Sequence, residues 1–315
     1  MTEASRDLSK SLSSFKVAHS FLRLVMVFIR SSISNGVDTE IENSGVTYKV
    51  CLVLFQGRHI QELHHAVPTV ASCGNVKFPQ DTQWSLSATS AASELLCGIS
   101  LEEAYALEEE TSAQASCPQW FTARKSRITA SIFHRVTNRV KAVNNTFLES
   151  IFGGKSFESA ATSYGRNTEA EAKASYVKQF PSRHLHDCGF VVNPKYSFIG
   201  ASPDAKVCDK GVTGILEIKC PYATKDQPLA DTASSKSSFC LGVAPEGLRL
   251  KRSHQYYIQV QGQLLVTGAP FCDFYVYTKK DTHIERILPD RDLCQEMLKK
   301  LHEFYTKHAQ KYLLS

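Results

Sequence analysis

Two acidic residues and a lysine stand at a spacing that suits a hydrolytic metal site. Asp204 lies in the tripeptide at residues 202–204, and Glu217 and Lys219 lie thirteen and fifteen positions further along the chain. Carboxylate oxygens are preferred ligands of Mg²⁺ and Mn²⁺ in proteins. A metal held by such ligands activates a bound water and steadies a phosphodiester beside it. These residues therefore predict metal-assisted hydrolysis of a phosphodiester.

A buried strand is expected to position two of these side chains. Residues 214–219 are largely apolar and are bounded by Gly211 and Pro221. On a strand, Glu217 and Lys219 share one face, whereas Ile218 points to the other face and leaves its backbone carbonyl at the edge. We expect Asp204, Glu217 and the carbonyl of Ile218 to hold the metal. Lys219 would orient the water, or deprotonate it if desolvation lowers the lysine pKa.

A plainer interpretation treats Glu217 and Lys219 as an exposed strand pair and Asp204 as a turn residue. The apolar neighbours favour the site, because a carboxylate and an ammonium on one face of a buried strand are costly unless they are paired or serve a function.

The segment from Trp120 to Leu148 carries six Lys or Arg residues and no acidic residue. Such a basic face suits a nucleic-acid backbone. Arg124 and Ser131 are expected near the start of a helix, where a cation, a hydroxyl and free amides favour a phosphate. A solvated basic helix is the alternative.

Two further polar residues, each on a predicted helix, are candidate site residues. Glu169 lies in a helix expected over residues 157–180, and Gln259 lies in a helix expected over residues 253–267. Gln259 has the hydrogen-bonding groups to reach a phosphate or the attacking water. Taken singly, both also fit ordinary surface positions.

The periodicity predicts a mixed sheet flanked by helices, an α/β or α+β fold. The expected elements are a helix at 128–140, the helix at 157–180, a hairpin of 189–193 and 197–201, a strand at 214–219, a disordered loop at 223–236, the helix at 253–267, strands at 272–278 and 283–288, and a helix at 290–312. Residues 1–117 read as a region of unknown role and residues 118–315 as the nuclease-like domain.

Charge and cysteine usage narrow the class of protein. Residues 1–115 hold 8 basic and 13 acidic residues, so the net charge of +5 arises from the C-terminal two-thirds. That imbalance places any polyanionic partner there. Ten cysteines without a Cys-x-x-Cys pair predict reduced thiols rather than disulfides or a zinc finger. The apolar run at 21–29 is too short for a membrane span, so a soluble intracellular protein is expected, nuclear in a eukaryote and otherwise cytoplasmic.

Five motifs taken in order resemble the YqaJ-like viral recombinase family, which includes phage lambda exonuclease, within the PD-(D/E)XK nuclease superfamily. The resemblance spans residues 120–278. The motifs are the Trp-to-Ser run at 120–131, the Gly-to-Glu step at 165–169, residues 202–204, residues 216–221 and the Gln-Val-Gln at 259–261.

The resemblance implies a restriction-endonuclease-like core and a Mg²⁺- or Mn²⁺-dependent exonuclease that degrades linear duplex DNA from the 5′ end during recombination or repair. It implies metal ligation by Asp204, Glu217 and Ile218 with support from Glu169. It also implies catalytic roles for Lys219 and Gln259, and a 5′-phosphate site at Arg124 and Ser131.

A single-strand annealing protein and a homotrimer are the partners that it implies. The alternatives are a structure-specific endonuclease and a non-catalytic DNA-binding accessory module.

Overall fold

The computed structural model describes residues 39–43, 46–50, 77–78, 98–153 and 159–315. The chain divides into two compact units, residues 1–66 and residues 67–315. In the first unit, β1 (Thr39–Asn43) and β2 (Val46–Val50) pair antiparallel. In the second unit, the described residues form the sheet and helices that carry every candidate site residue.

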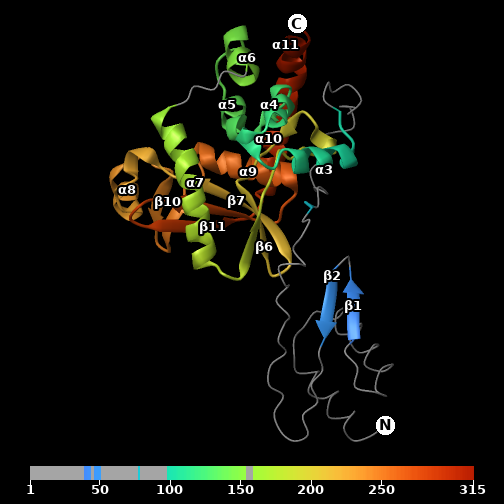
Figure 1. Cartoon of the computed structure of the whole chain (residues 1–315). Coiled ribbons are helices and arrows are strands. Elements are labelled where there is room, and N and C mark those ends of the chain that lie inside the picture. Colours follow the sequence, from blue (N-terminus) through green and yellow to red (C-terminus); the bar gives the residue numbers. More distant parts are fainter. Residues whose placement is uncertain (1–38, 44–45, 51–76, 79–97, 154–158) are drawn as a thin grey trace, which may run out of the picture. The chain divides into compact units, whose positions relative to one another are not determined.

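A five-stranded mixed sheet organises the second unit (Figure 1). Its strand order is β11-β10-β7-β6-β4, in which β7 pairs parallel with β10 and antiparallel with β6. The predicted mixed sheet is therefore confirmed. The strands are β4 (Arg183–His186), β6 (Ala205–Asp209), β7 (Val212–Lys219), β10 (Cys272–Tyr277) and β11 (Thr282–Ile287).

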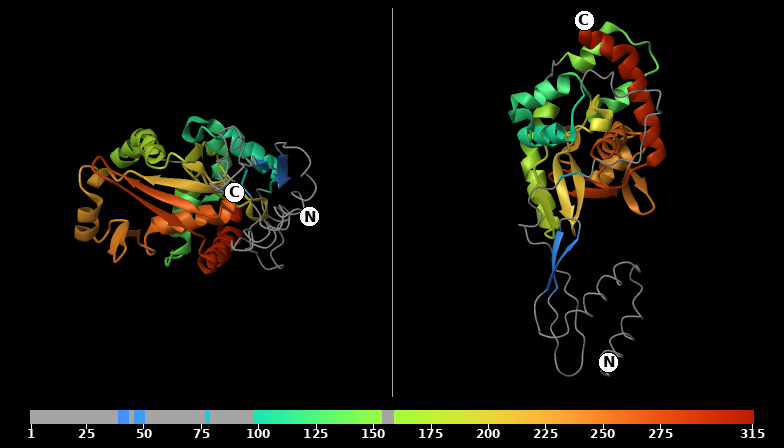
Figure 2. Two further views of the ribbon diagram at one scale, coloured as in Figure 1. Left: turned by 90° about the horizontal axis from the view of Figure 1, so that it is seen from below. Right: turned by 90° about the vertical axis from the view of Figure 1, so that its right-hand side faces the viewer.

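Helices cover both faces of this sheet (Figure 2). On one face, α7 (Ala160–Gln179) packs Tyr176 against Leu216 and Ile218 of β7. On the other face, α9 (Gln255–Thr267) and α10 (Arg291–Phe304) join Ile215 in the larger apolar core. Successive residues of β7 thus face opposite helices, as the period of a strand requires.

Shorter elements complete the unit. They are α3 (Leu101–Glu110), η3 (Gln114–Ser116), α4 (Pro118–Lys125), β3 (Ile128–Thr129), η4 (Ala130–Ile132), α5 (Phe133–Thr137), α6 (Asn145–Phe152), η5 (Pro194–Tyr196), β5 (Ile199–Gly200), η6 (Tyr222–Thr224), α8 (Leu229–Ser235), β8 (Leu241–Ala244), β9 (Gly247–Leu250), the π-helix η7 (Tyr305–Ala309) and α11 (Gln310–Leu314).

Three predicted elements differ from the structure. The hairpin expected at 189–193 and 197–201 is reduced to a single antiparallel bridge between Val191 and Ala201, because β5 pairs with β3 instead.

The other two differences are a helix and a loop. The helix expected at 128–140 is wrong at both ends, because Ile128 pairs with Ile199 in a short parallel sheet and Val140 is 98% exposed. The loop expected at 223–236 contains α8, whose first amide, that of Leu229, donates to the Asp281 carboxylate at 2.9 Å. Asp281, 52 residues away, thus caps the start of α8, and the local sequence alone does not predict this helix.

Hydrogen bonds cross the boundary predicted between residues 117 and 118. Glu108 of α3 accepts from Lys206 Nζ at 2.7 Å, and Gln114 donates to the carbonyls of Cys188 and Pro203, each at 2.8 Å. Residues 101–117 are therefore bound to the sheet in the second unit. Among the described residues, no helix is long and apolar enough to cross a membrane, and the run at 21–29 lies outside them.

Candidate active site

A buried carboxylate on β7 gathers three nitrogen donors. Glu217 is 2% exposed, and its Oε1 accepts hydrogen bonds from Lys219 Nζ and, at 2.6 Å, from Gln259 Nε2. Its Oε2 accepts from Gln263 Nε2 at 2.6 Å. Because Glu217 and Lys219 alternate with Ile218 along the strand, their heads face α9, which supplies both glutamines. The predicted grouping of Glu217, Lys219 and Gln259 is thus present.

Asp204 lies beside β7, on the side of that strand that faces β6. Its amide donates to the Leu216 carbonyl at 3.0 Å, and its Oδ2 accepts from the Ile218 amide at 2.6 Å. These bonds fix Asp204 just before β6 begins. In an extended strand the amide and carbonyl of one residue point to the same side, so the Ile218 carbonyl also faces this edge. The predicted oxygen donors of Asp204 and Ile218 therefore share one edge of β7.

The charged groups of this cluster shift one another's pKa values. Burial raises the pKa of the Asp204 carboxyl well above its ordinary value, and the nearby Glu217 charge raises it further. Burial also lowers the pKa of Lys219, but Glu217 and Asp204 outweigh that effect and leave it above the ordinary lysine value. This shift is that of the cluster without a metal, so the lowered lysine pKa expected beside a bound metal stays a prediction. In the cluster as it stands, Lys219 donates a hydrogen bond to Glu217.

The donor chemistry of this edge fits a small divalent cation. Two carboxylates and a carbonyl are hard oxygen ligands. Asp204 is half-buried, and within the described residues no hydrogen bond reaches its Oδ1, so this oxygen has a free coordination position. A divalent cation would also offset the repulsion that raises the Asp204 pKa.

Glu169 makes no hydrogen bond with the cluster of Asp204, Glu217 and Lys219 among the described residues. It lies on α7, its side chain is 35% exposed, and it pairs with Lys173 at 2.8 Å. In the part of the chain that the structure describes, no three His, Cys, Asp or Glu side chains are grouped closely enough to hold a metal. Ligation by Glu169 therefore stays a prediction, although its charge contributes to the raised pKa of Asp204.

The predicted phosphate residues lie on separate short elements. Arg124 is in the last turn of α4, not at a helix start, and its guanidinium stacks on Trp120 at 3.8 Å from the ring centre. Ser131 lies in η4, where its hydroxyl hydrogen-bonds with Thr129 at 3.1 Å. The helix-start position expected for Arg124 is thus wrong. No hydrogen bond joins Arg124 to Ser131 among the described residues.

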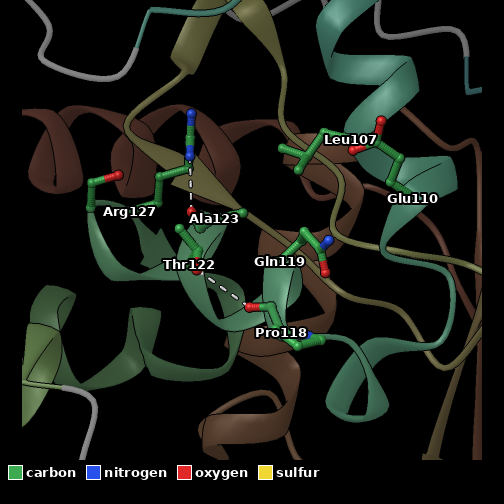
Figure 3. A pocket seen from close by; sticks show the side chains of 8 residues that line it. Leu107, Glu110, Pro118, Gln119, Thr122, Ala123 and Arg127 are labelled. Carbon is green, nitrogen blue, oxygen red and sulfur yellow. Dashed lines mark hydrogen bonds between the residues drawn. The ribbon is translucent and has the colours of Figure 1, made fainter.

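A shallow groove of about 530 Å³ lies along α4 (Figure 3). Arg127 is held there by bonds to the carbonyls of Ala123 at 2.8 Å and Ser197 at 2.9 Å. None of Asp204, Glu217 and Lys219 lines the groove, so it is separate from the carboxylate cluster. Its lining residues are Leu107, Glu110, Pro118, Gln119, Thr122, Ala123, Ser126 and Arg127.

Sequence reasoning missed two contacts of the site. Gln263 stands four positions after Gln259 and therefore on the same face of α9, which is the signal that could have identified it. Trp120 Nε1 donates to Ser202 Oγ at 2.9 Å, joining α4 to the tripeptide that carries Asp204. That second contact joins residues 82 positions apart and has no local signal.

Comparison with known proteins places this arrangement in a family. The profile of the YqaJ-like viral recombinase domain matches residues 119–270. This match covers just under half of the chain and confirms the resemblance drawn from the motifs. No curated protein matches the chain.

Solved structures of nucleases align with this chain. A SOX–DNA complex aligns with a TM-score of 0.51 at 14% identity, covering 68% of this chain and 72% of SOX, and at that identity the likeness shows the fold alone. The alkaline exonuclease LHK-Exo from Laribacter hongkongensis aligns at 25% identity and a TM-score of 0.48, covering 62% of this chain and 94% of its own. A phage-related exonuclease from Haemophilus somnus aligns at 16% identity and a TM-score of 0.40, covering 59% and 96%.

Proposed function

We propose that this protein is a metal-dependent DNA nuclease, an exonuclease that degrades linear duplex DNA in recombination. The observation that carries the proposal is the cluster in which Lys219 and Gln259 bond to buried Glu217, beside the anchored Asp204. Two carboxylates, a lysine and an amide gathered at one partly buried place are costly for folding alone. The match of residues 119–270 to a viral recombinase domain supports the same reading, because such a domain acts on DNA.

Each residue of the cluster has a distinct part in the proposed reaction. Asp204, Glu217 and the Ile218 carbonyl would hold Mg²⁺ or Mn²⁺, which supplies charge stabilisation and an activated water when bound. Protonated Lys219 donates to the attacking water or to the scissile phosphate, where negative charge develops. Gln259 holds Glu217 Oε1 and, since its side chain is partly exposed, can also donate to a phosphate oxygen.

Digestion of end-labelled linear duplex DNA tests this proposal directly. With Mg²⁺ we expect nucleotides to be released progressively from the 5′ end of linear DNA, with closed circular DNA left intact. EDTA should stop the release. Cleavage of closed circles would contradict the exonuclease assignment, and an absence of both cleavage and metal binding would indicate a DNA-binding accessory module.

Arg124 is proposed to receive the terminal 5′-phosphate. In the described part of the chain no carboxylate pairs with this partly buried guanidinium, which lies between Trp120 and Phe190. Burial lowers the pKa of Arg124 to about 10, so it stays protonated at neutral pH. The bond from Trp120 to Ser202 places this cation on the side of the fold that carries Asp204. An unpaired cation beside a nuclease cluster suits a phosphate.

Replacing Arg124 by Gln should remove the preference for 5′-phosphate over 5′-hydroxyl ends. A charge-assisted bond contributes about 1.5–3 kcal/mol, so we expect a loss of about 10- to 100-fold in that ratio. Initial rates on the two end-labelled substrates measure it. Arg291→Gln, at an exposed position at the start of α10, is the matched control and should keep the wild-type ratio. An unchanged ratio in Arg124→Gln would place the phosphate elsewhere.

A homotrimer, a single-strand annealing partner and a role in repair remain proposals that follow from the family resemblance. Light scattering of the purified chain, with and without duplex DNA, measures the oligomeric state.

A further inference from the structure

Gln263 is a second amide on Glu217. Gln259 and Gln263 stand four positions apart on α9 and so project from one face of the helix. Gln259 donates to Oε1 of Glu217 and Gln263 donates to Oε2, each at 2.6 Å. The two amides therefore hold the two carboxylate oxygens separately, which fixes the plane of the carboxylate.

The surroundings of Gln263 are apolar. Gln263 is 1% exposed, and Val260, Leu264 and Val266 of the same helix are fully buried. Its Oε1 is buried and has no hydrogen-bond partner in the described residues. A buried amide oxygen left without a partner is unfavourable, and an aliphatic side chain would fill this space without that cost. Packing alone does not explain a glutamine here, whereas the bond to Glu217 does.

The bond from Gln263 also determines which oxygen of Glu217 can still accept a ligand. Each carboxylate oxygen can accept about two hydrogen bonds. Lys219 and Gln259 occupy both positions on Oε1, but Gln263 occupies one position on Oε2. One accepting position of Glu217 thus remains, and it is on the oxygen that Gln263 orients.

We infer that Gln263 is a positioning residue that holds Glu217 Oε2 for the divalent cation of the proposed nuclease. The inference rests on the proposed function. Gln263 acts through Glu217, as residues behind metal ligands do when they fix ligand orientation. Loss of Gln263 should therefore weaken metal binding directly, even when no DNA is present.

Another buried glutamine of α9 provides a matched control. Gln261 is fully buried, donates to the Leu288 carbonyl at 3.0 Å and accepts from the Asp290 amide at 2.8 Å. It has the same side chain, helix and burial as Gln263, but its bonds lead away from Glu217. Met has a similar size and flexibility, so Gln→Met removes the amide while keeping the volume.

The test compares Mn²⁺ binding, by titration calorimetry without DNA, in the full chain, Gln263→Met and Gln261→Met. Removing such a supporting bond typically weakens metal binding by 10- to 100-fold. We expect a loss of about 10-fold or more in Gln263→Met, and wild-type affinity in Gln261→Met despite its lower melting temperature. The Mg²⁺ concentration for half-maximal DNA hydrolysis should rise in parallel in Gln263→Met alone.

Equal Mn²⁺ affinities in the two variants and the full chain would overturn the role of Gln263 and leave the proposed function intact. A full chain that binds no Mn²⁺ would overturn both. Should Gln263→Met fail to fold, Gln263→Asn keeps a polar amide but withdraws it from Glu217. That variant should show the same loss of affinity, and wild-type affinity in it would contradict the inference.

Discussion

Replacing Lys219 by Met or Asp204 by Asn should lower hydrolysis of linear duplex DNA in Mg²⁺ by about 10³-fold or more. Lys219 is the cation bonded to buried Glu217, and Met removes its charge and its donors while keeping most of its length. Asn at 204 keeps the shape of the side chain but removes the negative charge that is expected to hold the metal. Initial rates on labelled linear DNA, at equal protein and Mg²⁺ concentrations, measure both effects.

Controls separate this loss from unfolding. Lys300→Met removes an exposed lysine that pairs with Glu296 on α10, and it should hydrolyse DNA at the wild-type rate. Thermal unfolding should show that both site variants remain folded at the assay temperature. Asp204 and Lys219 both interact with the other charges of the cluster, so the melting temperature of each variant is expected to differ from that of the wild type. Near-wild-type hydrolysis in both folded variants would refute the nuclease assignment.

The strand that carries the site was predictable because its local signals agree. Apolar residues fill 215–218 except at Glu217, and Gly211 and Pro221 mark its ends. The structure gives β7 as Val212–Lys219, with Leu216 and Ile218 in one core and Ile215 in the other. An alternating pattern fixes the face of each side chain, so the partnership of Glu217 and Lys219 followed from spacing alone.

The errors arose where distant residues decide the local structure. Ile128 has helical spacing with later apolar residues, but pairing with Ile199 draws it into a strand. The α8 segment is small and polar, and Asp281 supplies its N-terminal bond from another part of the chain.

The largest stability effect is expected at Asp273 on β10, beside the strand that carries Glu217. Asp273 is fully buried and accepts bonds from Tyr176 at 2.6 Å, Arg183 at 3.0 Å and Arg286 at 2.7 Å. Asp209 also contacts both arginines, at 3.3 Å from Arg183 and 2.8 Å from Arg286. The network joins α7, β4, β6, β10 and β11, so one carboxylate holds one helix and the strands at both ends of the sheet.

Replacing Asp273 by Asn should therefore destabilise the fold by about 3 kcal/mol, since removing one partner of a buried ion pair leaves the other charges uncompensated. The figure is at the lower end of the usual range because Arg286 is 35% exposed and water can solvate it. For a unit of this size the melting temperature should fall by about 10 °C. Thermal unfolding monitored by circular dichroism measures the change.

Glu296→Gln, which breaks an exposed pair with Lys300 on α10, is the control and should melt at the wild-type temperature. At a temperature where Asp273→Asn is still folded, DNA hydrolysis should stay within a few-fold of wild type. Asp273 bonds to Tyr176, which packs with Ile218 on the face of the sheet opposite Glu217, so the substitution does not touch the cluster around Glu217. A melting temperature within 2 °C of wild type, by the same relation about 1 kcal/mol or less, would show that Asp209 alone neutralises both arginines.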